Sequence, residues 1–407
     1  MNIWIDINHV PQLNFYKHFI SVLADKGHRV YVTVLGRGKL PVIAQKELQG
    51  LQNVSVEVIG KHKMSKWSIF WDANLYRLFQ MWNWRKKHSI DISFTNGCHT
   101  AILSRFFGER SYTFGDDPQT KLYPVFVKAP TQSHMLIYED TTNGKILRGD
   151  KVMPCLKEWA YLNPRTFVPN EKVLEKYGVK PKEYIFLREV TVGTTNYAGQ
   201  KSGAILGIKD MIPAGMKVLF SLEEKKRRSE YPADWILLQE PIEDIHSLIY
   251  YSAGLVSSGD SMAREAALLG VPSYYLGIRY SMPANAAASK VASLQNQRTM
   301  GFEAWIREYI TQKTESQIAC SNPNSLEPQS ACMQASRQPD AQSYSDTDEQ
   351  YLSDSSQKRT KNAKNGHAGE NVIEQRMRQQ QELRARIDAE FIDINEYMLR
   401  LVEGVKE

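Results

Sequence analysis

The sequence predicts an α/β protein of two doubly wound domains whose parallel sheets face a central cleft. Three observations support this prediction. At 407 residues the chain exceeds what one hydrophobic core usually serves, so two domains are expected. It opens with a strand, a helix and a second strand. Short apolar strands with intervening helical and turn segments then recur through both halves.

The first half begins with a βαβ unit. Residues 2 to 7 form a strand, a helix runs through Phe19 and Leu23, and residues 29 to 35 form the next strand. Gly27 follows the helix where a left-handed C-cap is expected. Two parallel strands joined in this way imply a sheet with helices on both faces and ligands beyond the carboxyl ends of the strands. Further strands of this half are predicted at 54–59, 90–94, 111–114 and 151–153.

The second half repeats the pattern without a close internal sequence repeat. Its predicted strands are 184–187, 217–221, 235–238, 254–257 and 273–276. The segment from Cys155 to Pro169 is rich in proline and aromatic residues, as expected of a crossing between domains. We therefore divide the body of the chain into Rossmann-like domains at 1–165 and 166–313.

The end of the chain has a different composition. Residues 314–369 are rich in Ser, Gln, Asn, Asp and Lys and carry few large apolar side chains, which predicts a disordered low-complexity insert. In residues 370–407 the apolar side chains recur at steps of three and four, which predicts an amphipathic helix. That helix either docks on the folded body or serves as an arm for oligomer formation.

Charge and composition narrow the function classes. The net charge of +6 suits anionic ligands, but no zinc-finger, RNA-binding or basic-zipper pattern accompanies it, so nucleic acid is not an expected partner. The four cysteines are scattered without metal-ligand spacing, and no metal is expected. The chain has no secretion signal and no apolar run of about 18 residues, so we expect a cytoplasmic protein.

The strongest local signal lies between Gly254 and Pro272, where an apolar strand breaks at a Ser/Gly turn and enters a helix. Small residues let backbone N–H groups approach an anion, and a helix N-terminus attracts a diphosphate without a metal. In this hypothesis Ser261 caps the helix and the Glu265 carboxylate accepts hydrogen bonds from ribose hydroxyls. The alternative is a capped core helix in which Glu265 pairs with a neighbouring cation. The residues assigned to binding in this segment are Ser258, Gly259, Asp260, Ser261, Met262 and Glu265.

This segment is similar to the donor-binding motif of GT-B enzymes, such as MurG-type glycosyltransferases and non-hydrolysing UDP-N-acetylglucosamine 2-epimerases. Several blocks between residues 1 and 310 also resemble the family called domain of unknown function 354. They are Trp4-Ile5-Asp6-Ile7, Lys26-Gly27-His28, Val58-Ile59-Gly60-Lys61-His62, Lys157-Glu158-Trp159-Ala160-Tyr161-Leu162 and Met262-Ala263-Arg264-Glu265. The resemblance implies a GT-B-like fold with an acceptor-side domain at 1–165, a nucleotide-sugar-binding domain at 166–313, and a nucleotide-diphosphate sugar as substrate.

Candidate catalytic residues follow the strands of the first half. His9 is a candidate general base for an acceptor hydroxyl, with Asp6 to orient it. In an epimerase-like mechanism, Asp116, Asp117 and His99 would instead move the proton at the sugar C2 atom. Each also has a structural interpretation, in which Asp6 and Asp117 only organise turns.

Two further features have open interpretations. Arg188, just past a strand of the second half, is a candidate phosphate ligand or a solvated surface charge. The segment from Trp67 to His88 places aromatic residues at helical spacing and ends in a basic cluster. Such a helix either packs on the sheet or lies peripherally on the inner face of a membrane.

The sequence thus favours a GT-B-type glycosyltransferase that uses a nucleotide-sugar and a glycan or lipid-linked acceptor, in surface polysaccharide biosynthesis. One alternative is a UDP-sugar 2-epimerase-like isomerase or hydrolase on the same scaffold. Another is a non-catalytic protein that binds a sugar nucleotide, because a fold alone does not determine function.

Overall fold

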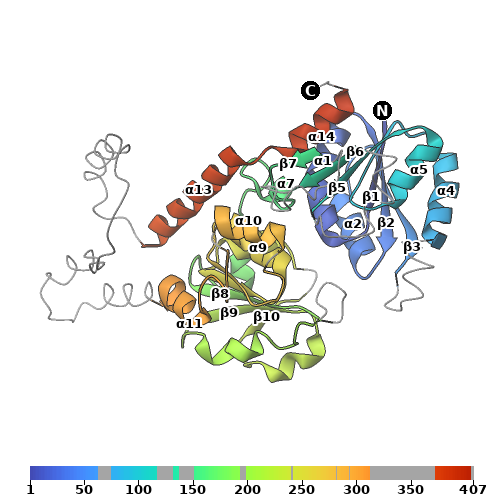
Figure 1. The fold of residues 1–407 in the computed structure, drawn as a ribbon. Coiled ribbons are helices and arrows are strands. Elements are labelled where there is room, and N and C mark those ends of the chain that lie inside the picture. Colours follow the sequence, from blue (N-terminus) through green and yellow to red (C-terminus); the bar gives the residue numbers. More distant parts are fainter. Residues whose placement is uncertain are drawn as a thin grey trace, which may run out of the picture.

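The computed structural model describes residues 1–62, 75–116, 132–136, 151–192, 199–239, 242–280, 282–292, 294–311 and 372–404. These residues form two α/β lobes, each built on a parallel sheet (Figure 1). The predicted insert at 314–369 lies outside the described residues.

The N-terminal lobe contains a seven-stranded sheet in the order β3-β2-β1-β4-β5-β6-β7, and every neighbouring pair is parallel. The strands are β1 (Asn2–Ile7), β2 (Arg29–Gly36), β3 (Val54–Lys61), β4 (Ile92–Thr95), β5 (Arg110–Gly115), β6 (Gln132–Leu136) and β7 (Lys151–Met153). All but β6 coincide with strands that the sequence predicts, within a few residues at their ends.

Helices cover both faces of this sheet. They are α1 (Val10–Asp25), α2 (Leu40–Leu48), α4 (Arg77–Lys87) and α5 (His99–Phe107). Ile3 and Ile5 belong to the same buried cluster as α1, whereas Trp4 points to the other face and packs with Trp84 of α4. Alternating side chains of one strand therefore fill two helical layers. Gly27 adopts a φ of +79° directly after α1, as a left-handed helix end requires.

The C-terminal lobe has a six-stranded parallel sheet in the order β10-β9-β8-β11-β12-β13. Its strands are β8 (Tyr184–Glu189), β9 (Lys217–Leu222), β10 (Ile236–Leu237), β11 (Gly254–Ser257), β12 (Ser273–Tyr275) and β13 (Leu294–Asn296). In both lobes the strand order reverses between the first strand and the fourth. Open α/β sheets bind ligands at this switch point, beyond the carboxyl ends of the strands.

The helical elements of the C-terminal lobe are shorter. They are η2 (Glu171–Tyr177), η4 (Leu206–Met211), η5 (Lys225–Glu230), α8 (Ile245–Tyr250), α9 (Asp260–Leu268), α10 (Pro283–Val291), α11 (Phe302–Trp305) and η6 (Ile306–Thr311). On one face of the sheet, α9 contacts both α10 and α8. On the other face, Trp305 of α11 packs with Tyr274 of β12.

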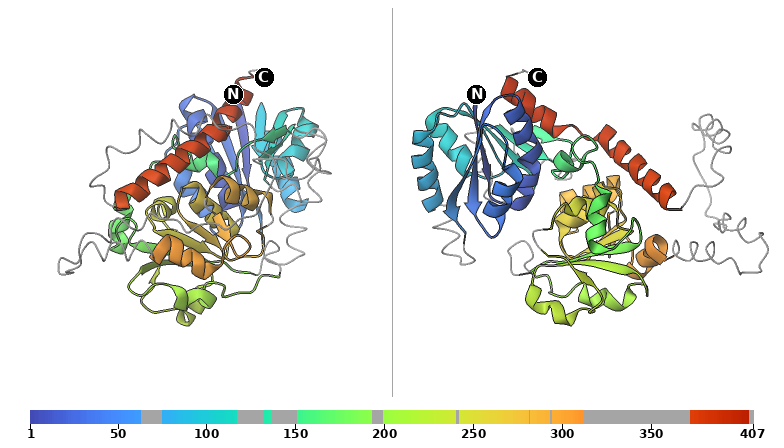
Figure 2. Two further views of the ribbon diagram at one scale, coloured as in Figure 1. Left: turned by 60° about the vertical axis from the view of Figure 1, so that its left-hand side comes forward. Right: turned by 180° about the vertical axis from the view of Figure 1, so that it is seen from behind.

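Two segments connect the lobes. The crossing helix α7 (Trp159–Leu162) contacts α1 of the N-terminal lobe and α9 of the C-terminal lobe. The chain end forms α13 (Val372–Glu390) and α14 (Ile394–Glu403) in place of one continuous helix. Gln380 of α13 bonds to Lys182 and Leu269 of the C-terminal lobe, and α14 contacts α1 (Figure 2). The chain therefore ends against the lobe in which it began.

Candidate functional site

His9 lies at the carboxyl end of β1, immediately before α1. The residue is exposed, and its Nδ1 atom lies 2.8 Å from the Arg37 Nη1 atom. Partial desolvation by the surrounding protein, followed by the charges of Arg37, Lys157 and His62, lowers the pKa of His9 to about 4. The imidazole is therefore neutral at pH 7 and able to accept a proton, but it is a weaker base than an ordinary histidine.

Asp6 does not orient His9, contrary to the sequence-based expectation. Its carboxylate is fully buried and accepts bonds from the Arg77 guanidinium at 2.7 and 3.2 Å and from the Thr33 hydroxyl at 2.6 Å. Arg77 also donates to Asn8 Oδ1 at 2.8 Å and lies 3.4 Å from His99 Nδ1. Two opposite charges buried in contact satisfy each other, so Asp6 serves to hold α4 against the end of β1.

Arg77 is not among the site residues that the sequence predicts, although it stands in the segment with the aromatic stripe. Its side chain passes over Gly60, which adopts a φ of +81°. A Cβ atom at Gly60 would lie 2.7 Å from the Arg77 Cγ and Cδ atoms. A glycine is therefore required there by both the backbone conformation and the approach of the arginine. The only signal for this arrangement in the sequence is a lone arginine in the apolar part of the segment.

Asp116, at the end of β5, lies beside the ammonium group of Lys157. Burial raises the pKa of Asp116, but the Lys157 ammonium and the Arg264 guanidinium outweigh it and hold the pKa below its usual value. Asp116 is therefore ionised at neutral pH. The second acid of the pair, Asp117, lies outside the described residues.

The Ser/Gly turn after β11 is buried, and α9 begins at Asp260. Gly259 is the N-cap residue, and Ser261 lies inside the first turn, so the prediction that Ser261 caps the helix is wrong. Ser258 accepts a bond from the Val190 backbone N–H at 2.9 Å, which ties the turn to the end of β8. The hydroxyl of Ser258 therefore already has a hydrogen-bond partner within the protein. Ser261 and Met262 are the part of this motif that is partly exposed.

Four charged side chains surround the start of α9. Arg264 donates to Glu158 Oε1 at 2.8 and 3.1 Å, and both side chains are 2% exposed. Asp260 Oδ2 lies 3.3 Å from Arg264 and 3.2 Å from Arg279. Two carboxylates balance two guanidinium groups. The Arg279 side chain is 25% exposed, so it is the most accessible cation of the four.

Glu265 points into the protein instead of outward. Tyr161 Oη donates to Glu265 Oε1 at 2.7 Å, and His246 Nε2 lies 3.5 Å from Oε2. Burial raises the pKa of Glu265, but His246, Tyr161 and Arg264 together hold it below its usual value. A ribose would have to displace Tyr161 or His246 to bind this carboxylate, and the ribose contact stays a prediction.

Arg188 points toward the end of β9. It donates to the Ser221 hydroxyl at 2.6 Å and pairs with Glu223. Its backbone carbonyl meets the α9 turn, where it accepts a bond from Ser258 N at 3.0 Å. The guanidinium therefore already has an anionic partner, and its assignment to a phosphate also stays a prediction.

Lys157 and Glu158 bring the two lobes together. Lys157 pairs with Asp116 of the N-terminal lobe, and the adjacent Glu158 pairs with Arg264 of α9. The charge of Arg264 also acts on Asp116. Asp116 of the first lobe, whose charge acts on His9, therefore lies close enough to α9 of the second lobe for the charge of Arg264 to affect its pKa.

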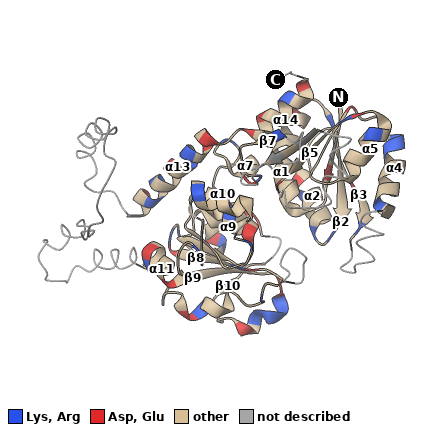
Figure 3. Ribbon diagram, viewed as in Figure 1, with Lys and Arg blue, Asp and Glu red and all other residues tan. Residues whose placement is uncertain are grey.

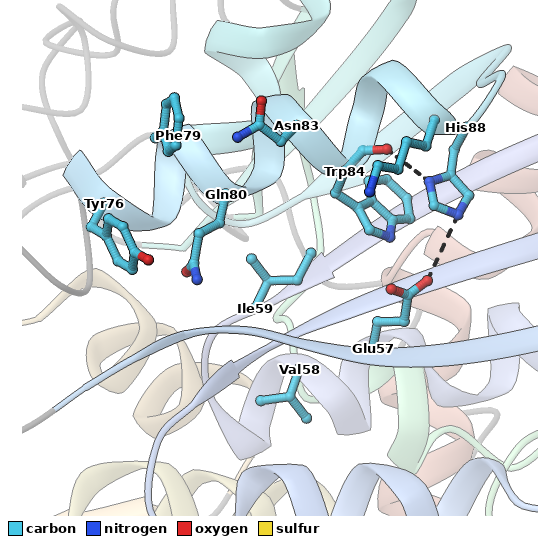
Figure 4. A pocket seen from close by; sticks show the side chains of 10 residues that line it. Glu57, Val58, Ile59, Tyr76, Phe79, Gln80, Asn83, Trp84 and His88 are labelled. Atoms are coloured by element: carbon cyan, nitrogen blue, oxygen red, sulfur yellow. Dashed lines mark hydrogen bonds and ion pairs between the residues drawn. The ribbon is translucent and has the colours of Figure 1, made fainter.

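A separate groove of about 420 Å³ lies on the outside of the N-terminal lobe, between β3 and α4 (Figure 4). Its lining includes the exposed aromatic side chains of Tyr76 and Phe79. Glu57 and His88 form a pair 3.8 Å apart at its end. None of its lining residues belongs to the lobe junction.

Two negative findings apply to the described residues. No group of three or more His, Cys, Asp or Glu side chains there is placed to hold a metal ion. Of the helices that the structure describes, none combines the length and the apolar character needed to span a membrane.

No model of a known protein family matches the chain, so the resemblance to the domain of unknown function 354 family is not supported. No curated protein matches it in sequence.

Solved structures do match the fold. One is a putative UDP-N-acetylglucosamine 2-epimerase from Listeria monocytogenes, with a TM-score of 0.56 and 11% identity over 78% of this chain and 89% of that one. Another is the UDP-GlcNAc 2-epimerase from Methanocaldococcus jannaschii, with a TM-score of 0.53 and 13% identity over 76% and 92%. A third is the glycotransferase of kitacinnamycin, with a TM-score of 0.50 and 13% identity over 78% and 91%. The chain therefore has the GT-B fold that glycosyltransferases and UDP-GlcNAc 2-epimerases share.

Proposed function

We propose that the chain is a nucleotide-sugar-dependent glycosyltransferase that works at the junction of its lobes. The observation that carries this proposal is that Asp116, whose charge acts on His9, lies close enough to α9 for the charge of Arg264 to affect its pKa. A neutral imidazole, an ionised carboxylate and a helix N-terminus at one junction provide a proton acceptor, a charge to orient it and a site for an anion. Structures of related fold are described as bound to UDP and to UDP-GlcNAc, so UDP-sugars are the first donors to test.

In the proposed reaction, the diphosphate of the donor lies against the partly exposed Ser261 and Met262 at the start of α9, with Arg279 as the nearest accessible cation. The acceptor hydroxyl loses its proton to His9 as its oxygen attacks the anomeric carbon. The bond from that carbon to the donor phosphate breaks, and the nucleoside diphosphate leaves with the electron pair. The ion pairs among Glu158, Asp260, Arg264 and Arg279 hold α9 in place, and the proposed reaction uses no metal.

An epimerase-like reaction is the second candidate, because Asp116 is an ionised carboxylate whose charge acts on the imidazole of His9. These two groups have the chemistry to exchange a proton at a sugar carbon next to the reacting one. Such an enzyme would convert the donor with no acceptor present. A protein that binds the donor but never converts it would instead be a sugar-nucleotide sensor.

The test is a panel of UDP-, GDP- and CMP-sugars followed by melting temperature and product NMR. A transferase gives stabilisation by one donor, with turnover only when an acceptor is added. His9→Gln should then abolish turnover while keeping the donor-induced stabilisation. His28→Gln, at the amino end of the same sheet, is the matched control and should change neither. Inversion at C2 without an acceptor would establish the epimerase, and no stabilisation by any donor would refute the whole proposal.

The ribose contact of Glu265 has its own test. Glu265→Ala should weaken donor binding if the carboxylate accepts bonds from ribose hydroxyls. Binding equal to that of the wild type would remove Glu265 from the site, and the Tyr161 bond at 2.7 Å would then be its whole role.

A peripheral membrane contact extends the proposal to a lipid-linked acceptor. The described part of the 67–88 segment buries Met81 and Trp84 in the lobe but leaves Tyr76 and Phe79 exposed. Basic residues occur on α4 and α5 at this edge of the lobe (Figure 3). Co-sedimentation with phosphatidylglycerol vesicles but not with phosphatidylcholine vesicles would support the contact. If the protein is absent from the pellets of both vesicle types, the membrane contact is excluded.

A further inference from the structure

Arg37 stands at the carboxyl edge of the N-terminal sheet because of an irregularity between β2 and β3. The register between these strands shifts between Val34 and Gly36. Gly36 approaches β3 so closely that a Cβ atom there would lie 2.6 Å from the Gly60 carbonyl oxygen. The Gly36 carbonyl then accepts a bond from the His62 backbone N–H at 3.0 Å. The bulge thus sets Arg37 and His62 next to each other at the strand ends.

The guanidinium group of Arg37 is partly buried, and it contacts no carboxylate among the residues that the structure describes. Its side-chain partner is the imidazole of His9, 2.8 Å away. Three other arginines near the carboxyl ends of the sheets differ from Arg37, because each pairs with a carboxylate: Arg77 with Asp6, Arg188 with Glu223 and Arg264 with Glu158. Arg37 is therefore a half-buried cation for which the described residues provide no carboxylate.

Among the described residues around Arg37, no carboxylate balances its positive charge. Burial and the charge of Arg37 lower the pKa of both His9 and His62, so both imidazoles are neutral at pH 7. Lys157 is balanced by Asp116. A guanidinium fork binds the oxygens of a phosphate or a carboxylate in pairs, and neutral imidazole N–H groups donate to the same oxygens. The described residues around Arg37 therefore provide donors for an anion and no carboxylate of their own.

We propose that Arg37, with His9 and His62, binds an anionic group of the acceptor, a phosphate or a carboxylate. This inference rests on the proposed transferase function, because it names the class of acceptor for that site. The anion site and the start of α9 lie on opposite lobes, so acceptor and donor approach the junction from opposite sides.

Binding of this anion has a consequence for His9. The Arg37 Nη1 atom lies 2.8 Å from both ring nitrogens of His9, so it donates to the nitrogen that carries the lone pair a general base needs. An anion that takes over the guanidinium releases this lone pair. The added negative charge also favours the protonated imidazole. The acceptor itself therefore activates the base that removes its proton.

The experiment measures anion binding without a nucleotide. Inorganic phosphate is titrated into the full chain by calorimetry at constant ionic strength, and the C2 proton resonance of His9 is followed by NMR. We expect saturable binding that moves the His9 resonance. Arg37→Met should weaken the binding by about tenfold or more, and Arg37→Lys should recover part of it. Arg29→Met, at the exposed amino end of the same strand, is the control and should bind as the wild type does.

A second titration uses glucuronate in place of phosphate. Tighter binding of phosphate indicates a phosphorylated acceptor, and tighter binding of glucuronate indicates an acidic sugar. Equal binding by wild type and Arg37→Met would overturn the inference, as would a folded wild type that binds neither anion. Loss of UDP-sugar stabilisation in Arg37→Met would also overturn it, because Arg37 would then hold the donor. If no nucleotide-sugar stabilises the wild type while phosphate still binds through Arg37, the proposed function fails and the anion site stands.

Discussion

Replacing Glu158 by glutamine should destabilise the protein more than any single charge change on its surface. The substitution keeps the shape of the side chain but removes the charge that faces Arg264. Both groups are 2% exposed, and the guanidinium donates to the carboxylate at 2.8 and 3.1 Å. Breaking one partner of such a buried pair costs roughly 3–5 kcal/mol, because an uncompensated charge remains inside.

The structure places Glu158→Gln near the lower end of that range. Arg264 keeps Asp260 at 3.3 Å and Asn285 Oδ1 at 2.6 Å, so part of its charge and hydrogen-bonding capacity stays satisfied. Asp260 is shared with Arg279, however, and cannot compensate Arg264 fully. We therefore expect a loss of about 3 kcal/mol in the free energy of unfolding.

Urea denaturation followed by tryptophan fluorescence measures this loss, and the buried Trp159 next to Glu158 reports on the lobe junction. The double variant Glu158→Leu with Arg264→Met removes both charges and should recover most of the stability. Glu47→Gln is the control, because its partner Lys17 is 51% exposed and such surface pairs contribute about 1 kcal/mol or less. A Glu158→Gln variant within about 1 kcal/mol of the wild type would refute the reasoning, since the pair would then not be isolated from water.

Three further predictions concern other parts of the molecule. Gly60→Ala should lower the melting temperature and detach Arg77, because it strains a φ of +81° and places a methyl group 2.7 Å from the arginine; an unchanged melting temperature would contradict this. Gln380→Leu should cost about 1–3 kcal/mol in urea denaturation, because the buried Lys182 ammonium loses its bond at 2.7 Å, and a neutral effect would mean that α13 does not dock there. The pKa of Glu265 is lowered in the folded protein, so its charge stabilises the fold above the unfolded pKa and this stabilisation is lost as the pH falls through the folded pKa. The melting temperature of the wild type should therefore exceed that of Glu265→Gln at pH 7 by more than at pH 3, and a constant difference would contradict the sign.

The apolar pattern of the chain is sufficient to predict most of the strands. Central parallel strands such as β8 and β11 are buried on both faces, so they appear as apolar runs between turn residues, as at 184–187 and 254–257. Strand β6 escapes this rule, because its sequence Gln-Ser-His-Met-Leu is polar at its start. It forms a strand because it pairs with β5 on one side and β7 on the other. The local sequence does not show that this pairing is available.

The sequence indicates the candidate site residues because they follow the ends of predicted strands. The strands β1 and β5 belong to one parallel sheet, so His9 and Asp116 follow strands that end at the same edge, whereas α9 belongs to the other lobe. Partners of each charge could not be predicted, because they come from distant positions. Asp6 meets Arg77 across 71 residues, and Arg264 meets Glu158 across 106. Such pairs depend on how the helices pack on the sheet, and no local sequence pattern specifies this packing.

The sequence by itself determined the α/β class with two parallel sheets and the strand ends at which polar side chains gather. The physical reason is that apolar periodicity and turn residues act within a few positions of the chain. Only the tertiary structure decided which charged side chains pair with other groups of the protein. Burial is a property of the packed molecule, so it alone separates Asp6, Arg188 and Glu265, which have protein partners, from Arg37, which pairs with no carboxylate among the described residues.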